Sequence, residues 1–216
     1  MSIDGYSGCG KSSLAKTLAR ELGYSYIDTG AMYRAVTLYF IRHQVLLTDA
    51  KAVAAALANI HIDFAEQRTF LNQEDVEHEL RTLTIGQWVS QIAAISDVRR
   101  ALVAQQRSMG QLGGIVMDGR DIGTVVFPNA ELKIFVTANL DVRVARRHRE
   151  LLALGHNISQ DAVRQDLAER DRIDASRSDS PLQQATDAIV LDNSYFTFTE
   201  FVAAGLALAH KVLNDR

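Results

Sequence analysis

Short apolar runs recur along the chain, and most of them end in aspartate. They are SID at 2–4, YSYID at 24–28, GIVMD at 114–118 and AIVLD at 188–192, with LKIFV at 132–136 as a further run. Runs rich in isoleucine, valine and aromatic residues, separated by helical stretches, predict parallel strands that are buried on both faces. The pattern therefore predicts an α/β fold, with aspartates at the sheet edge where such folds bind ligands.

Helical periodicity fills the stretches between these runs. It predicts helices over 12–22, 31–43, 90–106 and 140–154, and Gly23 and Gly155 are natural C-terminal stops for the first and the last. From about 49 to 112 the alternation of strands and helices breaks. IHIDF and RTFLNQ in this span predict a hairpin, so we interpret the span as an insertion between strands of the main sheet.

Composition narrows the function classes. The 216 residues suit one domain with an insertion, and a net charge of −3 offers no global basic field for nucleic acid. Cys9 is the only cysteine, and the six histidines lack ligand-like spacing, so neither a disulfide nor a zinc site is expected. The longest apolar stretch, 201–209, is too short to span a bilayer, and no secretory signal pattern is visible. We expect a soluble, cytoplasmic monomer without nucleic-acid or membrane partners.

The most specific motif is Gly5-Tyr-Ser-Gly-Cys-Gly-Lys11-Ser12, which satisfies G-x-x-x-x-G-K-[ST] in full. In such a loop backbone N–H groups and the lysine hold the phosphates of a nucleotide, and the serine hydroxyl can ligate Mg²⁺. The plain alternative is a glycine-rich turn before an ordinary helix. A strand before and a helix after favour the nucleotide, which we expect to contact Gly5, Tyr6, Ser7, Gly8, Cys9, Gly10, Lys11, Ser12 and Ser13.

Two further motifs follow strands. Asp118 ends the most apolar run and could bind Mg²⁺ directly or through water, although Asp-Gly is also a common turn pair. In the segment 28–34, Thr29 could cap a helix, and Arg34 lies one turn later, where it could bind a second phosphate.

Arginine is concentrated between residues 143 and 177. A solvated, salt-bridged helix face is the ordinary explanation of such a segment. In a chain of net negative charge we favour a mobile lid that closes on phosphates. On a helix, Arg170, Asp174 and Arg177 would share one face. The arginines are Arg143, Arg146, Arg147, Arg149, Arg164, Arg170, Arg172 and Arg177.

In this order the motifs resemble those of bacterial cytidylate kinases, P-loop enzymes that phosphorylate CMP. The resemblance runs through IDGYSGCGKSS, DTGAMYR, VSQIAAISDVRRALVAQQR, MDGRDIGTVVFPNAELKIFVTA, ERDRIDASR and SPLQQATDAIVLDNS. The P-loop is common to many families, whereas DGRDIGTVVFP is far more specific. The resemblance implies a three-layer P-loop NTPase fold with a core at about 1–48, 113–145 and 179–216. It also implies a nucleoside-monophosphate (NMP)-binding insertion at about 49–112 and an arginine-rich lid at about 146–178.

The resemblance further implies ATP and CMP or dCMP as substrates, with Mg²⁺. By motif, the cytosine would be bound by Ser90, Arg99 and Asp121, and the CMP phosphate by Arg34 and Arg120, with Thr29 and Tyr33 alongside. Arg170, Asp174 and Arg177 would serve the sugar and the reacting phosphates. Catalysis would rest on Lys11, Arg170 and Arg177, the metal on Ser12 and Asp118, and further ATP contacts on the lid residues Arg146 and Arg147.

The chemistry of the base supports a carboxylate at position 121. Cytosine presents an N4 amine, from which Asp121 can accept, whereas uracil presents O4, a second acceptor. A P-loop kinase for another small acceptor, such as UMP/CMP, AMP or shikimate, is the alternative. A GTP-dependent switch would need an N-K-x-D motif near a late strand, which this sequence lacks.

Overall fold

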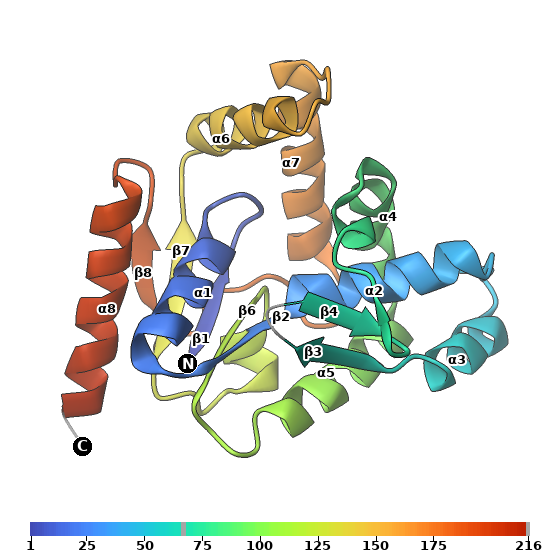
Figure 1. The fold of residues 1–216 in the computed structure, drawn as a ribbon, viewed down its shortest axis with the longest axis horizontal. Coiled ribbons are helices and arrows are strands. Elements are labelled where there is room, and N and C mark those ends of the chain that lie inside the picture. Colours follow the sequence, from blue (N-terminus) through green and yellow to red (C-terminus); the bar gives the residue numbers. More distant parts are fainter. Residues whose placement is uncertain (66–67, 215–216) are drawn as a thin grey trace. The chain divides into compact units, whose positions relative to one another are not determined.

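The computed structural model describes residues 1–65 and 68–214, and its main sheet is parallel (Figure 1). The strands are β1 (Ser2–Gly5), β2 (Ser25–Asp28), β6 (Ile115–Gly119), β7 (Lys133–Thr137) and β8 (Ile189–Asp192). Their order is β2-β6-β1-β7-β8, so β1 lies in the centre. All five predicted strands are confirmed, and so is the α/β fold. Asp4, Asp28, Asp118 and Asp192 lie at or next to the carboxyl ends of their strands.

Internal contacts divide the chain into two compact units, residues 1–26 with 114–216, and residues 27–113. The first unit holds α1 (Lys11–Leu22), α6 (Leu140–Ala153), α7 (Gln160–Ser176), α8 (Phe198–Asn214) and a short π-helical turn, η2 (Ile122–Val126). α8 lies beside α1 (Figure 1), and Gly205 allows the close approach, since a Cβ there would lie 2.7 Å from Leu14 Cδ1. The buried core includes Ile3, Leu18 and Phe201.

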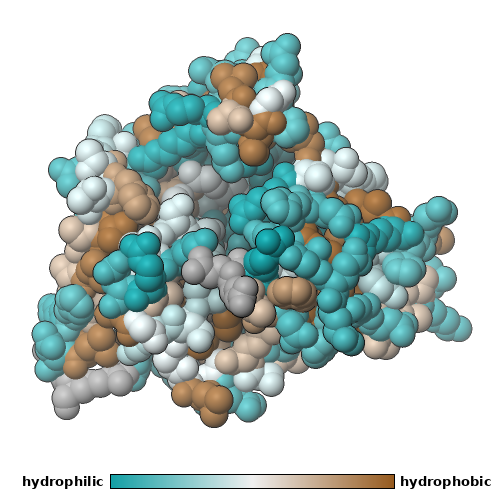
Figure 2. All heavy atoms as spheres, in the orientation of Figure 1, coloured by the Kyte–Doolittle hydropathy of each residue, from teal (hydrophilic) through white to brown (hydrophobic). Residues whose placement is uncertain are grey.

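Helices α6 and α7 form a hairpin with a small apolar core of its own. Val144 and Leu151 of α6 pack there with Val163 and Leu167 of α7. Hydrophilic side chains dominate the surface over this hairpin at the top of Figure 2, where a few apolar side chains interrupt them. We refer to this element as the α6–α7 hairpin.

The second unit combines helices with a small antiparallel sheet. Its elements are α2 (Thr29–Arg42), α3 (Ala50–Ala58), β3 (Ile62–Ala65), β4 (Arg68–Leu71), β5 (Glu74–Asp75), the 3-10 turn η1 (Glu79–Arg81), α4 (Leu83–Ala93) and α5 (Ser96–Met109). The predicted hairpin forms as β3 and β4, and β5 extends it to three strands. This unit begins at Ile27 and ends at Gly113.

The predicted helix over 90–106 is wrong as a single element. The backbone leaves helical geometry at Ile95, with φ −74° and ψ 119°, and Ser96 starts a new helix. Apolar periodicity continues across the break, because Ile92 of α4 and Val98 of α5 are both buried, and this continuity concealed the break. The predicted helices 12–22, 31–43 and 140–154 are confirmed within two residues as α1, α2 and α6.

The glycine stops are confirmed. Gly23 and Gly155 take left-handed conformations, with φ +67° and +82°. Over residues 1–65 and 68–214, no helix combines the length and the apolar character needed to cross a membrane.

Candidate functional site

The P-loop joins the end of β1 to the start of α1, and glycine is required at both of its ends. Gly5 has φ +149°, and a Cβ there would lie 2.0 Å from the carbonyl oxygen of Val136. Gly10 caps α1 in a left-handed conformation, φ +95°. Among the described residues, no side chain caps this helix and no acid lies in its first turn. The N–H groups at the start of α1 thus suit an anion, which the helix dipole also favours.

Lys11 is the cation inside this loop. Its side chain is buried, and Nζ donates a hydrogen bond of 3.0 Å to the carbonyl oxygen of Tyr6. Burial and then the positive charge of Arg120 lower the pKa of Lys11 from its ordinary value. A buried ammonium of this kind gains most from an anionic ligand, because the anion would supply the charge compensation that burial has removed.

Ser12 and Asp118 present oxygen atoms to each other across the loop. Ser12 Oγ donates to Asp118 Oδ2 at 2.7 Å, and the hydroxyl of Tyr26 donates to Asp118 Oδ1 at 2.8 Å. Within the described residues there is no group of three or more His, Cys, Asp or Glu side chains that could hold a metal ion. Mg²⁺ is usually held by one or two carboxylates together with phosphate oxygens and waters. This pair of oxygen donors beside the loop therefore fits Mg²⁺.

Arg120 links the end of β6 to both the P-loop and α7. Its Nη2 donates to Ser7 Oγ at 2.8 Å, and its Nε donates to Asp174 Oδ2 at 2.7 Å. Arg177 Nη1 lies 3.3 Å from the other oxygen of Asp174. Burial by itself raises the pKa of Asp174, but Arg120 and Arg177 outweigh it and hold the pKa below its usual value. The structure thus brings a second cation, the partly buried Arg120, directly to the P-loop.

Asp121 follows and starts the π-helical turn η2. The turn is held by Asp4, whose two carboxylate oxygens accept from the backbone N–H groups of Ile122 at 2.8 Å and Gly123 at 2.7 Å. Burial, partly offset by these two bonds, raises the pKa of Asp4 to about 6. Single turns of π-helix are rare and occur often at functional sites. Asp4 therefore fixes the backbone that presents Asp121.

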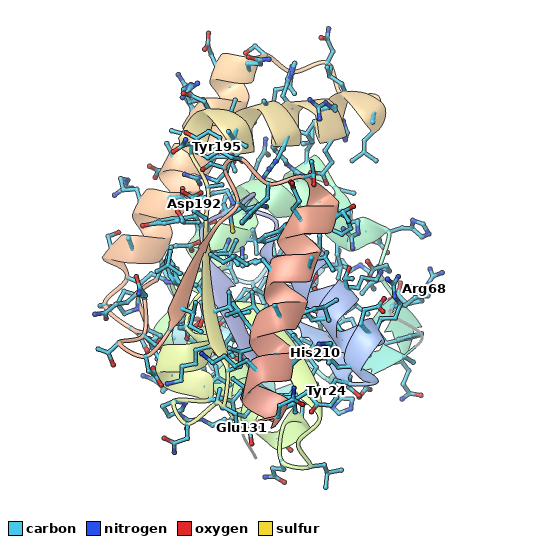
Figure 3. The ribbon with its side chains drawn as sticks, turned by 90° about the vertical axis from the view of Figure 1, so that its left-hand side faces the viewer. Tyr24, Arg68, Glu131, Asp192, Tyr195 and His210 are labelled. Atoms are coloured by element: carbon cyan, nitrogen blue, oxygen red, sulfur yellow. The ribbon has the colours of Figure 1, made fainter. Side chains whose placement is uncertain are left out.

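The arginines of α6 meet the loop that follows β8. Arg146 Nη2 donates to the carbonyl oxygen of Asn193 at 2.9 Å, and Asn193 Nδ2 donates to the carbonyl oxygen of Cys9 in the P-loop at 2.9 Å. Within the described chain, the buried Nη1 of Arg146 has no hydrogen-bond partner. Asp192 at the end of β8 and Tyr195 of this loop lie near the N-terminal end of α8, as Figure 3 shows. Arg147 instead forms an ion pair of 2.9 Å with Glu150.

Arg170 of α7 lies one turn before Asp174 on the same helix. Its Nη1 is 3.8 Å from Asp166 Oδ2, a long contact with a half-exposed carboxylate. Arg170 and Asp174 both lie on α7, whereas Arg177, expected on the same helix face, is the cap residue that follows its last turn.

In the second unit, Arg99 and Tyr33 lie together. The Arg99 guanidinium carbon is 5.5 Å from the centre of the Tyr33 ring, and Nη1 donates to the carbonyl oxygen of Ala93 at 3.3 Å. Arg99 is 1% exposed, which is unusual for an arginine. Ser90 of α4 is buried as well.

Arg34 and Thr29 lie on the first turns of α2. Arg34 Nη1 is 3.8 Å from Asp28 Oδ2, and about a quarter of its side chain is exposed. The interpretation of Thr29 as the helix cap is wrong, because Asp28 is the cap and accepts from the N–H of Ala31 at 2.9 Å. Thr29 is the first helical residue and is buried.

Sequence reasoning missed several residues that hold the P-loop. Asp171 of α7 accepts from the backbone N–H of Ser7 at 3.0 Å, and Arg143 of α6 donates to the carbonyl oxygen of Ser7 at 3.1 Å. Tyr26 and Asn193 were likewise missed. Arg143 stood out only as one arginine of a crowded segment. Asp4 could have been noticed as the aspartate that directly precedes the P-loop.

The parallel sheet with β1 in its centre, followed by a complete P-loop and α1, defines a P-loop nucleotide-binding protein. A solved structure of an uncharacterized protein from Eubacterium ventriosum ATCC 27560 has a similar fold, with a TM-score of 0.51 and 12% identity. The structural match covers 100% of this chain and 97% of the Eubacterium ventriosum chain.

A family model described as cytidylate kinase matches residues 1–211. Curated relatives named cytidylate kinase include one from Phocaeicola vulgatus, 53% identical over 93% of this chain and 91% of its own length. Another, from Parabacteroides distasonis, is 50% identical over 100% of this chain and 98% of its own length. The chain belongs to the cytidylate kinase family.

Proposed function

We propose that this protein transfers the γ-phosphoryl group of ATP to CMP, and to dCMP, giving CDP or dCDP and ADP. The observation that carries the proposal is Arg120. Its guanidinium donates to Ser7 of the P-loop at 2.8 Å, so a cation for a second phosphate lies next to the donor loop. In a kinase the donor and acceptor phosphates face each other, and a cation at this position can bind the second of them.

The P-loop residues bind the donor. The N–H groups at the start of α1 and the Lys11 ammonium hold the β- and γ-phosphates of ATP. Arg146 and Arg147 make further contacts with ATP. The hydrogen bond from Arg146 to the carbonyl oxygen of Asn193, whose amide in turn bonds the P-loop at Cys9, supports this role for Arg146. Mg²⁺, held through Ser12 and Asp118, would neutralise charge on the phosphates and orient them.

The acceptor phosphate needs no protein base. Its second pKa is about 6, so near neutral pH the attacking oxygen is already mostly ionised. That oxygen forms a bond to the γ-phosphorus while the bond to the β–γ bridging oxygen breaks, and ADP leaves with that electron pair. Arg120, Arg170 and Arg177 compensate the charge on the transferred group, and Arg34 binds the CMP phosphate with Thr29 and Tyr33 nearby.

The base is read by hydrogen bonds that uracil cannot reproduce. Asp121 accepts from the N4 amine of cytosine, and Ser90 and Arg99 provide complementary groups. With UMP, the Asp121 carboxylate would face O4, so two desolvated acceptors would oppose each other.

We also propose that residues of about 49–112 act as the NMP-binding insertion and residues of about 146–178 as the lid. The protein acts as a monomer.

A coupled assay of ADP release tests the proposal. The rate is measured with ATP, Mg²⁺ and CMP, dCMP, UMP or AMP as the acceptor. We expect the kcat/KM of CMP and dCMP to exceed that of UMP by at least about 100-fold, as for other sites that reject a mismatched hydrogen-bonding group. A preference for UMP or AMP would overturn the role of Asp121.

The variant Asp121→Asn should narrow the CMP-to-UMP ratio, because an amide can also donate to O4. The control is Asp161→Asn, an exposed aspartate in the first turn of α7, which should leave the ratio unchanged. An unchanged ratio in Asp121→Asn would exclude Asp121 from base recognition.

A further inference from the structure

The backbone of Ser7 is bound on both sides by charged residues of the α6–α7 hairpin. Its N–H donates to Asp171 Oδ1 at 3.0 Å, and its carbonyl oxygen accepts from Arg143 Nη1 at 3.1 Å. The same Nη1 donates to Asp171 Oδ2 at 2.5 Å. These three hydrogen bonds close a ring between the backbone of one P-loop residue, α6 and α7, which we call the Ser7 latch.

The latch is shielded from water. The side chains of Arg143 and Asp171 are 8% and 15% exposed. Arg143 Nε also donates to the carbonyl oxygen of Ala138 at 3.0 Å, and its guanidinium lies over the ring of Tyr6, 5.3 Å from the centre. Removing one member of such a buried pair leaves the other charge uncompensated, so the latch is sensitive to single substitutions.

Apolar packing joins the hairpin to the same point of the loop. A Cβ at Gly8 would lie 3.6 Å from Leu167 Cδ2 and 3.8 Å from Arg143 Cβ. Leu167 belongs to the small core between α6 and α7. The hairpin therefore binds the P-loop through two hydrogen bonds to Ser7, and Leu167 lies beside the adjacent Gly8.

A second link from α7 reaches Ser7 through Arg120, which bonds Ser7 Oγ and Asp174. In the proposed function Arg120 also binds a substrate phosphate, so this link must change when substrates arrive. Asp171 and Arg143 are given no substrate contact there, so no substrate competes with the Ser7 latch for either side chain.

We propose that Asp171 and Arg143 are positioning residues. They dock the α6–α7 hairpin onto the P-loop and thereby hold Arg170, the neighbour of Asp171 on α7, at the transferred phosphoryl group. The inference rests on the proposed function and deepens it. If the latch is lost, ATP still binds. Arg170 and the α6–α7 hairpin are then misplaced relative to the γ-phosphate, so water competes with CMP for the phosphoryl group.

The test compares Asp171→Asn with Glu169→Gln. Glu169 lies on the same helix and pairs at the surface with Arg172, 2.7 Å away, so it is a matched control. For Asp171→Asn we expect a fall in the kcat of transfer of about tenfold or more, because small misplacements of reacting groups are costly. The KM of CMP should stay within about threefold, and the share of ATP lost to water should rise. Glu169→Gln should keep the wild-type kcat, KM of CMP and share of ATP hydrolysed.

Arg143→Lys provides a second variant that retains the positive charge but not the forked geometry. It should likewise lower kcat while the KM of CMP stays nearly unchanged. The kcat of the double variant should be little lower than that of either single variant, since both substitutions break the same ring of hydrogen bonds. If Asp171→Asn does not fold, Arg143→Lys carries the test alone.

Two failures are distinguishable. Wild-type protein that hydrolyses ATP but does not phosphorylate CMP would refute the proposed function. Wild-type transfer together with an unchanged kcat and an unchanged hydrolysis share in Asp171→Asn and Arg143→Lys would refute the latch. A loss in these variants that appears only as a proportional drop in folded protein would likewise refute a positioning role.

Discussion

Lys11 is the residue on which the donor side of the account depends. Its ammonium is buried in the P-loop and is held by the carbonyl oxygen of Tyr6. Replacing it in Lys11→Met should lower the rate of CMP phosphorylation by at least about 100-fold, since it removes a charge that acts on the developing phosphate charge. Lys16→Met, an exposed lysine of the same helix, is the control. The melting temperatures should match, and wild-type turnover in Lys11→Met would contradict the P-loop assignment.

Asp4 gives the stability a particular pH dependence. Its folded pKa of about 6 lies above the ordinary aspartate value of 3.8, so the folded state binds this proton more tightly than the unfolded state. The stabilisation from the proton is complete below pH about 4 and is lost as the pH rises through about 6, by about 3 kcal/mol at most. Urea unfolding from pH 4.5 to 7 should show this decline in the wild type.

The variant Asp4→Asn has no proton to lose at this position. Its free energy of unfolding should therefore fall less over the same pH range than that of the wild type. Parallel pH profiles of the two proteins would show that Asp4 has an ordinary pKa in the folded state.

At the scale of elements, the junction between β1 and the P-loop tolerates only glycine. In Gly5→Ala the new Cβ would meet the Val136 carbonyl oxygen at 2.0 Å, so β7 or the loop must shift. We expect a loss of about 3 kcal/mol or more in the free energy of unfolding, measured in urea. Gly23→Ala also places alanine at positive φ, +67°, but meets no atom within 4 Å. It should cost only about 1 kcal/mol, and equal losses would contradict the steric account.

Elements with a strong pattern could be predicted from the sequence, and those fixed by tertiary bonds could not. The five strands follow from their apolar runs, and α1 and α6 from periodicity and their glycine stops. The break at Ile95 occupies too few residues to interrupt the apolar period. The π-helical turn η2 depends on the Asp4 carboxylate, more than one hundred residues away in the sequence, and no local pattern encodes it.

At the scale of the molecule, the sequence predicted the residue types of the site better than their connections. Motifs and the family resemblance predict the P-loop, Asp118, Arg120 and Asp174, and hydrogen bonds join Arg120 to Ser7 and to Asp174. They do not predict the Ser7 latch, because Asp171 and Arg143 look like ordinary members of charged helices until α6, α7 and the P-loop are brought together. A long-range contact between two single charged residues does not change the periodicity of a sequence, so one sequence alone does not reveal it.

The central claim is that CMP accepts the phosphoryl group itself. The most direct measurement follows a radiolabelled γ-phosphate of ATP in the presence of CMP and Mg²⁺ and separates the products. The account predicts that the label appears in CDP, in an amount equal to the ADP formed, with little inorganic phosphate. Label found in inorganic phosphate, with CMP unchanged, would contradict it.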